Sequence, residues 1–519
     1  MKINFLSKID KRIIFFIFLL GIAYLYNYQK IAFYRPQSVH NWRQSDCASL
    51  ALNYYQNGMN FFQPETHNLT SKKFTSGKAA PSEIPILYYF VAMLYRLFGY
   101  HDYIHRILNT VIFLIGIYSL FRILDKIKVN LVWNLTFSLI FFASPVLVYY
   151  GNNFLTDITA FSFSLIAWNY FISYYQSQKM KFYWISMLFF LLSMSMRISA
   201  GISVVALFCI FLLEAFSNIK FREGNKLFPQ RFLQILPFLA IFLIIGGWAY
   251  YARIYNTVNG CGYFSTTIYP VWKMSDAALS KTLENIRVMW IHQYFHKYTL
   301  IFFLIIFVFT IIFMRKANRF LIALQLIVFF GVVLFGVLWF DTFRDHDYYL
   351  INLYILLVFT SITFVELSTR NFPKIASNWI VFVLLFLFLG FNVNHTRKQM
   401  HDRYTGWWTE YPKYKDFHTI TPYLRSIGIT RHDTVISIPD KSHHTLYLMN
   451  QQGWTENFEQ NRDSAGIAQS VQHGAKYLMI ASREDLDARP YVKPFISDTI
   501  GKYNTIYIFR LKGKEFIDF

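Results

Sequence analysis

The sequence predicts an α-helical polytopic membrane protein that ends in a small α/β domain. Of its 519 residues, 55% are hydrophobic and 15% are charged, whereas a typical soluble protein has about 25% charged residues. Apolar runs close to the roughly 20 residues needed to cross a bilayer recur up to about residue 395. Beyond Asn394 the composition becomes polar, and short β-rich runs alternate with helical ones.

The net charge of +21 is distributed in a way that indicates membrane topology. Lys and Arg lie between the apolar runs and form no single patch, which is typical of cytoplasmic loops and disfavours a nucleic-acid partner. Three cysteines do not make a disulfide framework.

The first span is expected at Ile13–Tyr28, and its flanks set the orientation. Lys8, Lys11 and Arg12 precede it, so we expect a cytoplasmic N-terminus. No small-residue cleavage site follows the span, so we interpret it as a retained helix and not as a signal peptide.

The run Ile84–Gly99 decides every later orientation. It contains Pro85 and Arg96, and about 15 helical residues span only about 22 Å, less than the roughly 30 Å of a hydrocarbon core. We therefore predict a helix that lies along the interface. The other ten spans are then expected at Ile104–Leu124, Leu131–Tyr150, Ile158–Tyr175, two short helices within Tyr183–Phe216 that meet near Arg197, Phe232–Tyr251, Tyr298–Met314, Phe320–Phe340, Tyr348–Val365 and Ala376–Val393.

These eleven crossings make every inner loop basic and leave the C-terminus outside. We expect a transmembrane domain at 1–394, with its first outer loop at 29–103, and a soluble α/β domain at 395–519. In the soluble domain the expected strands are Thr434–Ile438, Lys476–Ile480 and Thr505–Leu511, and Ser464–His473 is an expected helix.

Polar clusters gather on the predicted outer face, each at the end of an apolar run. Ionisable groups at membrane depth are costly and usually face a cavity or a partner, so the collection indicates an enzymatic or transport site. The clusters are His40–Asp46, which opens a long polar loop, Lys78–Glu83, Asp102–Arg106, Asn152–Asp157, Arg197 and Arg344–Tyr349.

Three acids in these clusters have both a chemical and a structural interpretation. Asp46 can act as a general base, and Asp46 and Asp157 can equally be N-caps of outer-face helices. Glu83 falls at the start of the interfacial helix, where the helix dipole favours an acid. Glu83 and Asp157 are the residues that could hold a divalent metal ion.

Several cations could pair with a phosphate. Lys78, Arg106 and Arg197 are candidates, and snorkelling to lipid head groups is the structural alternative for each. The segment Arg344–Tyr349 is the densest polar cluster between spans, although its tyrosines also suit an interface belt. His443 and His444 are expected at the surface. The sequence contains no phosphate-binding glycine loop or serine nucleophile elbow, which disfavours ATP-driven transport and serine hydrolysis.

Together these residues resemble the GT-C superfamily of membrane glycosyltransferases. The resemblance is to the protein O-mannosyltransferase-like family 39, which includes the bacterial lipid A aminoarabinose transferases. It depends on Asp46 before Asn53-Tyr54-Tyr55 and Gly58, on Glu83-x-Pro85 before a short helix ending at Gly99, on Arg106, on Asp157, and on the late segment Asp345–Tyr349. Cys47 stands where the mannosyltransferases have a second acid, and Ile84 stands where the aminoarabinose transferases have a lysine.

The resemblance implies a sugar donor linked to polyprenyl phosphate, undecaprenyl phosphate in a bacterium, and transfer with inversion to a hydroxyl of a lipid, glycan or protein. It implies a multi-pass protein of the bacterial inner membrane that acts on its periplasmic face among membrane lipids. Asp46, Glu83 and Asp157 would be catalytic, and the resemblance leaves a divalent metal ion open. Donor and phosphate binding would fall to Arg43, Lys78, Arg106, Arg197, Arg344, His346 and Tyr348.

Two other function classes fit the spans. A flippase or transporter of polyprenyl-linked sugar would have similar intramembrane charges, but the sequence lacks a matched pair of Gly/Pro-broken spans in two halves. A non-catalytic membrane scaffold would not need acids gathered on one face.

Overall fold

The computed structural model describes residues 10–217, 219–264, 268–406 and 410–516. The chain forms two compact units. The helical unit consists of Met1–Ala32, Ile107–Gly247 and Thr267–His401, and the mixed unit consists of Phe33–Arg106, Trp248–Thr266 and Asp402–Phe519.

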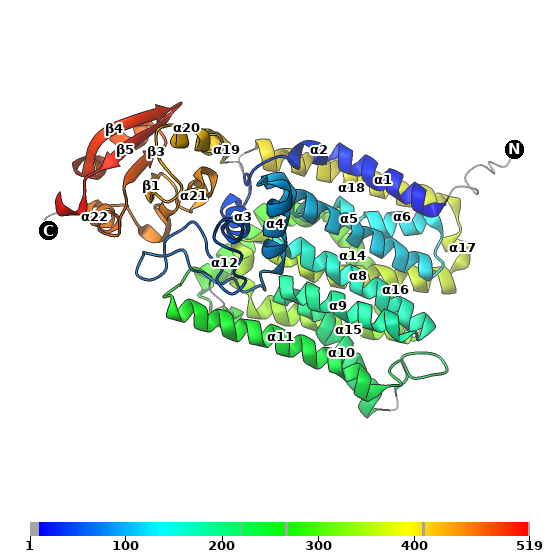
Figure 1. Ribbon diagram of the computed structural model, residues 1–519. Helices are drawn as coiled ribbons and strands as arrows, with labels where there is room; N and C mark the ends of the chain where they lie inside the picture. Colours follow the sequence, from blue (N-terminus) through cyan, green and yellow to red (C-terminus); the bar gives the residue numbers. More distant parts are fainter. Residues whose placement is uncertain (1–9, 218, 265–267, 407–409, 517–519) are drawn as a thin grey trace. The chain divides into compact units, whose positions relative to one another are not determined.

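The helical unit is a bundle of apolar helices that pack side by side (Figure 1). Polar N-caps begin several of them: Asn130 and Asn318 each accept a hydrogen bond from the backbone two residues on. The unit contains α1 (Lys11–Leu25), α2 (Tyr28–Ile31), most of α5 (Asp102–Lys126), α6 (Leu131–Leu139), α7 (Pro145–Gly151), α8 (Thr156–Ser177), α9 (Met180–Met196), α10 (Gly201–Phe216), most of α11 (Arg231–Val258), α12 (Asp276–Asn285), α13 (Ile291–Tyr294), α14 (Lys297–Ile312), α15 (Arg319–Leu338), α16 (Ile355–Asn371), α17 (Pro373–Ala376) and most of α18 (Trp379–Thr405).

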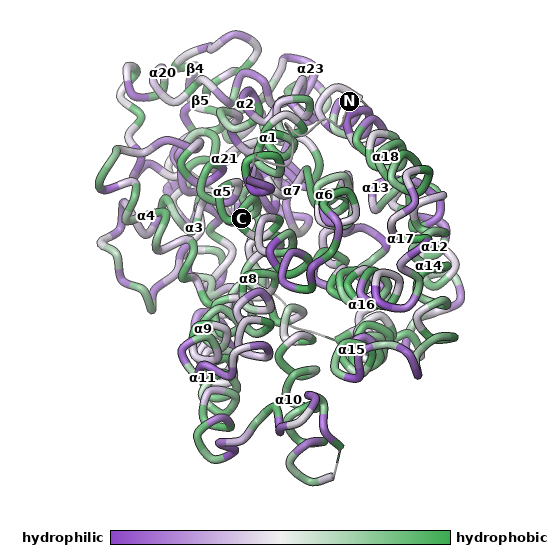
Figure 2. Tube along the Cα trace, turned by 90° about the vertical axis from the view of Figure 1, so that its right-hand side faces the viewer, coloured by the Kyte–Doolittle hydropathy of each residue, from purple (hydrophilic) through white to green (hydrophobic). Residues whose placement is uncertain are grey.

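The apolar helices make this a multi-pass membrane protein. Among the described residues, six helical segments are long and apolar enough to cross a bilayer, and a seventh is possible if the bent pair of Asp276–Tyr294 and Lys297–Ile312 is one span. Large apolar side chains such as Leu243, Leu304 and Phe330 are mostly exposed, as expected of a surface that faces lipid. Figure 2 shows hydrophobic residues along much of α11, α14 and α15. The six segments are Asp102–Lys126, Ile198–Phe216, Arg231–Val258, Arg319–Leu338, Asp347–Asn371 and Trp379–Thr405.

The predicted spans differ from these helices mainly where the chain breaks. The break at Arg197 is confirmed, since α9 ends at Met196 and α10 begins at Gly201. The predicted span Leu131–Tyr150 is not one continuous helix: it contains two short helices, α6 and α7, because the chain turns at Ser144-Pro145. Its crossing of the membrane stays a prediction. The total of eleven crossings stays a prediction.

The mixed unit contains two helices from the predicted first outer loop, α3 (Asn41–Gln56) and α4 (Ile86–Phe98), which pack together. The apolar side of α4 is buried through Leu87, Val91 and Tyr95, and its 13 residues make it one of the shorter apolar helices. The α3 helix is polar on average yet almost wholly buried, so its polar side chains need partners inside the unit. The loop between α3 and α4 is tied down by isolated bridges, of which Asn68–Gly453 joins it to the sheet.

The rest of the mixed unit is a five-stranded sheet with short helices. The strand order is β2-β1-β3-β5-β4, in which β1 pairs in parallel with β2 and β3, and β5 is antiparallel to β3 and β4. The strands are β1 (Val435–Ile438), β2 (Gly453–Trp454), β3 (Tyr477–Ile480), β4 (Ile496–Tyr503) and β5 (Ile506–Leu511), and the helices are α19 (Tyr411–Tyr414), α20 (Thr421–Ser426), α21 (His444–Met449), α22 (Ser464–Gln472) and α23 (Arg483–Asp487).

The small α/β sheet confirms the predicted fold class of the C-terminal part. The three expected strands correspond to β1, β3 and β5, and the expected helix corresponds to α22. The domain boundary at 394/395 stays a prediction, and the α18 helix continues to Thr405.

Orientation in the membrane gives the first testable prediction. If the basic loops are cytoplasmic, the first outer loop and the C-terminal domain lie outside. Cysteines introduced at the exposed positions Gln63 and Lys441 should then react with a membrane-impermeant maleimide added outside. A cysteine at the exposed Lys226 should react only after the membrane is opened. The background variant replaces the three native cysteines. External labelling at Lys226 and none at Lys441 would reverse the assignment.

Candidate active site

Asp46 lies inside α3 and is almost completely buried. The expected loop at His40–Asp46 is therefore wrong from Asn41 onward, and so is the N-cap interpretation of Asp46, because the helix begins five residues earlier. The predicted loop was based on polarity, whereas these polar side chains are bonded within the unit. Ser45, for example, contacts the ring of His444, with 2.7 Å between its Oγ and Nδ1.

Two side chains from distant parts of the chain meet one oxygen of Asp46. Its Oδ1 lies 2.6 Å from the hydroxyl of Tyr263 and 2.6 Å from Nε2 of His443. The Tyr263 hydroxyl is also 3.0 Å from the His443 Nε2. The other oxygen, Oδ2, is buried, lies 3.7 Å from Nη1 of Arg43, and accepts no hydrogen bond within the described part of the chain. A buried carboxylate oxygen without a donor is uncommon and calls for an explanation.

The charge of Asp46 determines the protonation of His443. Burial alone would lower the pKa of this imidazole, but attraction to Asp46 and the hydrogen bond between them outweigh burial and raise it. The loop that presents His443 follows β1 directly and is held by Asp440, whose carboxylate accepts hydrogen bonds from the backbone N–H groups of Ser442 and Thr445, each at 2.8 Å. The loop thus holds the ring against Asp46, and the contact with Asp46 favours the cationic form of the imidazole.

Glu83 is joined to the same cluster through Arg43. Nη2 of Arg43 lies 2.5 Å from Oε1 of Glu83, and the Tyr88 hydroxyl donates to the same oxygen at 2.7 Å. Glu83 comes three residues before the first residue of α4, so it does not stand in the first turn of that helix as expected. The ring of Phe264 lies 5.7 Å from the guanidinium carbon of Arg43. The structure therefore brings the predicted residues Arg43, Asp46 and Glu83 together.

The segment that carries Glu83 is fixed by the last turns of α11. The Asn256 side chain bonds both the N–H and the C=O of Ala80, at 2.8 and 2.9 Å, and the Trp248 indole donates to the carbonyl of Pro81 at 3.2 Å. These bonds hold the backbone a few residues before Glu83.

Sequence reasoning missed two members of this cluster. His443 was expected at the surface together with His444, and both are in fact buried. Tyr263 was not singled out. No sequence spacing links these residues to Asp46, because Tyr263 is separated from it by a little less than half of the chain and His443 by most of the chain. The only available signal was a pair of histidines directly after a β-rich run.

Two predicted phosphate ligands of the mixed unit lie elsewhere. The buried Arg106 donates to the carbonyls of Tyr34 and Arg35, at 2.6 and 3.2 Å. Lys78 lies in an isolated bridge with Glu65 in the α3–α4 loop. Their phosphate-binding roles stay predictions.

In the helical unit, Asp157 and Arg197 form a buried ion pair. Nε of Arg197 lies 2.6 Å from Oδ1 of Asp157. Asp157 is the second residue of α8, in the first turn and not at the N-cap, where the helix dipole stabilises its charge. The guanidinium carbon lies 5.0 and 5.9 Å from the ring centres of Tyr349 and Tyr348, a cation–π arrangement. This cluster brings the predicted residues Asp157, Arg197 and Tyr348 together.

In the neighbouring segment Arg344–Tyr349, the charge of Arg344 is compensated by nearby acids. Arg344 is paired with Asp345 and Asp341, at 2.8 and 3.2 Å, and is partly exposed. Asp347 accepts a hydrogen bond from the Tyr150 hydroxyl at 2.7 Å. His346 packs on the ring of Tyr348, with 5.4 Å between ring centres.

The residues suggested for a metal do not form a ligand set within either unit. Glu83 and Asp157 each have one oxygen bonded to an arginine, and they belong to different units. Across the described residues, no group of three or more His, Cys, Asp or Glu side chains is placed to hold a metal ion. The metal role of these two acids stays a prediction.

Comparison with known proteins relates the fold to membrane glycosyltransferases. No protein-family model matches the sequence, and no curated protein matches it. The solved structures with a similar fold include ArnT from Cupriavidus metallidurans, with 10% identity over 96% of this chain and 98% of ArnT at a TM-score of 0.54. The oligosaccharyltransferase of Archaeoglobus fulgidus has 12% identity over 92% of this chain and 70% of its own, at 0.59. The mycobacterial arabinofuranosyltransferase AftD has 12% identity over 97% of this chain and 40% of its own, at 0.55.

These similarities confirm the resemblance to the GT-C glycosyltransferases at the level of the fold. The match to ArnT extends over nearly the whole of both chains.

The pair of His443 with Asp46 predicts a pH-dependent stability. Because folding raises the pKa of His443, the pair stabilises the protein fully below about pH 6.5, the ordinary value, and this contribution is lost as the pH rises through the folded pKa. The melting temperature of wild type minus that of His443→Gln should therefore be largest near pH 6 and shrink toward pH 9. The exposed His432, changed to Gln, is the control. A difference that does not vary with pH would contradict the charged pair.

Proposed function

We propose that this protein is an inverting glycosyltransferase that moves a sugar from a polyprenyl-phosphate donor to an acceptor hydroxyl. The observation that carries the proposal is the buried Asp46, whose Oδ1 is held by Tyr263 and His443 while Oδ2 accepts no hydrogen bond within the described residues. A base must be able to reach the proton that it removes. Because Oδ2 accepts no hydrogen bond within the described residues, we assign the acceptor proton to this oxygen.

The similar folds support the donor class. One structure of ArnT is bound to undecaprenyl phosphate, and one of the archaeal oligosaccharyltransferase is tethered to an acceptor peptide. A lipid-linked donor also suits a chain with several membrane-spanning helices. We infer an undecaprenyl-phosphate sugar as donor, the bacterial inner membrane as location, and the periplasmic face as the side of transfer.

The proposed reaction is a single displacement. The acceptor oxygen attacks the anomeric carbon, and its proton passes to Oδ2 of Asp46. The bond between the anomeric carbon and the phosphate oxygen breaks, and its electron pair leaves with the polyprenyl phosphate. Attack and departure on opposite sides invert the anomeric centre. No enzyme nucleophile is needed.

Within this scheme the partners of Asp46 position the base. Two donors on Oδ1 fix the carboxylate plane, which orients Oδ2. Arg43 connects the base to Glu83, and we assign these two residues to orientation of the sugar or of Asp46. Preorganised groups of this kind lower the barrier without rearranging during the reaction.

We assign the leaving phosphate to Arg197. Its guanidinium is held by Asp157 and by two tyrosine rings, so little side-chain freedom is lost on binding. It also precedes the N-terminus of α10, and helix N-termini favour anions. Tyr348, His346 and Arg344 are secondary candidates for contacts with the donor, as are Lys78 and Arg106.

Asp46→Asn tests the base. The amide keeps the shape and one acceptor oxygen, so folding and donor binding should persist, while transfer should fall by about 100- to 10,000-fold, the usual contribution of a general base. The measurement is initial transfer rate at saturating lipid donor. Asp433→Asn, the same change at a carboxylate bonded to Lys476, is the matched control and should remain active. Turnover of Asp46→Asn within a few fold of wild type would remove Asp46 from the chemistry.

Arg197→Ala tests the phosphate contact. Hydrogen bonds to charged groups contribute about 1.5–3 kcal/mol, so kcat/KM for the lipid donor should drop by about 10- to 150-fold. Arg315→Ala removes an exposed cation of the loop before α15 and should have no such effect. Equal donor kinetics in both variants would show that Arg197 only stabilises the fold.

A further inference from the structure

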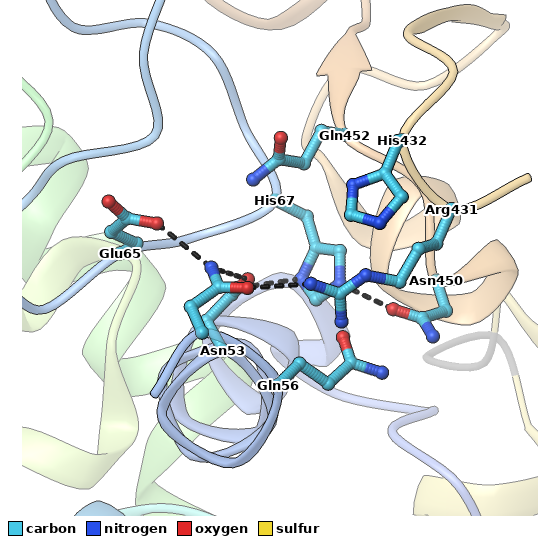
Figure 3. A pocket seen from close by; sticks show the side chains of 9 residues that line it. Asn53, Gln56, Glu65, His67, Arg431, His432, Asn450 and Gln452 are labelled. Carbon is cyan, nitrogen blue, oxygen red and sulfur yellow. Dashed lines mark hydrogen bonds between the residues drawn. The ribbon is translucent and has the colours of Figure 1, made fainter. Parts of the chain in front are cut away.

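The mixed unit contains a second polar site, a cavity of about 210 Å³ at the far end of α3. Figure 3 shows side chains from α3, from the α3–α4 loop, from the segment before β1 and from the segment after α21 facing a common space. His67 and Asn53 form its buried floor, and Asn57 and His432 are exposed. Every lining residue is polar: Asn53, Gln56, Asn57, Glu65, His67, Arg431, His432, Asn450 and Gln452.

The two charges of the cavity are joined by one carboxamide. Asn57 donates to Glu65 Oε2 at 2.9 Å and accepts from Nη2 of Arg431 at 2.7 Å. Glu65 and Arg431 are therefore a balanced pair that already has an internal partner. A ligand that brings its own net charge would leave one of the two without compensation, so the arrangement favours a neutral ligand.

The floor is a fixed hydrogen-bonding network around His67. Its Nε2 lies 3.1 Å from Oδ1 of Asn450, and its Nδ1 lies 2.6 Å from Oγ of Ser49. Since a carboxamide oxygen only accepts, Nε2 carries the proton and Nδ1 accepts from Ser49. Burial also lowers the pKa of His67 to about 4, in agreement with a neutral ring.

Two carboxamides of the wall have no assigned partner. Gln56 and Gln452 make no side-chain hydrogen bond within the described residues, yet they line the cavity. A carboxamide offers both a donor and an acceptor, which is also what a hydroxyl group requires. The cavity is smaller than the roughly 300–1,000 Å³ of pockets for drug-sized ligands. Its size and its lining fit a single neutral sugar unit.

The position of the cavity relates it to Asp46. Asn53 follows Asp46 by seven residues, which is two turns, and so lies on the same side of α3 about 10 Å further along the axis. We propose that this cavity binds a neutral saccharide unit of the acceptor, remote from the hydroxyl that reacts. The saccharide class stands on the cavity alone, whereas its role as part of the acceptor rests on the proposed function.

Binding can be measured without catalysis. The full chain is placed in nanodiscs without lipid donor and titrated separately with glucose, galactose, mannose and N-acetylglucosamine. Saturation-transfer NMR measures the binding of each sugar. At least one sugar should bind saturably. Gln56→Leu and Gln452→Leu each remove two hydrogen-bonding groups at similar size and should weaken that binding by about 10-fold or more. The control is Gln63→Leu, which changes an exposed glutamine of the α3–α4 loop outside the cavity. This variant should bind the sugar as wild type does.

Three results would overturn the inference: no saturable binding of any of the four sugars, unchanged binding in both leucine variants, or displacement of the sugar by equimolar glycine or inorganic phosphate. Separate measurements of sugar binding and of transfer on the wild-type protein distinguish the two proposals. Sugar binding that persists in a protein whose wild type transfers nothing would support the cavity and refute the glycosyltransferase function. Transfer without sugar binding would do the reverse.

Discussion

The buried carboxylate of Asp46, shared between His443 and Tyr263, is the interaction on which the mixed unit depends. A charge removed from water is tolerated only when other groups compensate it. Here the compensation comes from three distant segments: the α3 helix itself, the stretch after α11, and the loop after β1. The same contacts that make the buried charge tolerable also hold the C-terminal sheet against the α3 helix, so chemistry and folding share one set of bonds.

In the helical unit, the buried charge of Asp157 is compensated by the ion pair with Arg197. Removing one member of a buried ion pair typically costs about 3–5 kcal/mol, because the other charge is left behind. Asp157 lies in the first turn of α8, and Arg197 directly follows the last residue of α9. The break between α9 and α10 brings the arginine to the N-terminal side of α10. A continuous helix over this stretch would have satisfied more of the backbone hydrogen-bonding groups. The chain breaks here instead, and the break places the cation of Arg197 where a continuous helix would have an apolar turn.

The sequence was most informative where an ionisable residue interrupts an apolar run. Arg197 stood out for that reason, whereas Asp157, Glu83 and Asp46 stood out because their polar clusters lie at the ends of apolar runs. The alternation of β-rich and helical runs predicted β1, β3 and β5. It was least informative about pairing. His443 reaches Asp46 across nearly four hundred residues, and local patterns carry no such information.

Polarity also misled the prediction in two places. The α3 segment was expected to open a loop, whereas its polar residues are satisfied by neighbours within the same unit. The β4 strand was missed because its exposed residues, such as Asp498 and Lys502, lie at the edge of the sheet and lack the apolar alternation of a buried strand.

The most direct test of the account follows the fate of the lipid phosphate. The purified protein in proteoliposomes receives a polyprenyl-phosphate donor with a labelled sugar, and an envelope extract supplies the acceptor. We predict that free polyprenyl phosphate appears in step with labelled acceptor, and only when the extract is present. Movement of the intact labelled lipid across the bilayer, with no free polyprenyl phosphate, would contradict a glycosyltransferase and identify a transporter.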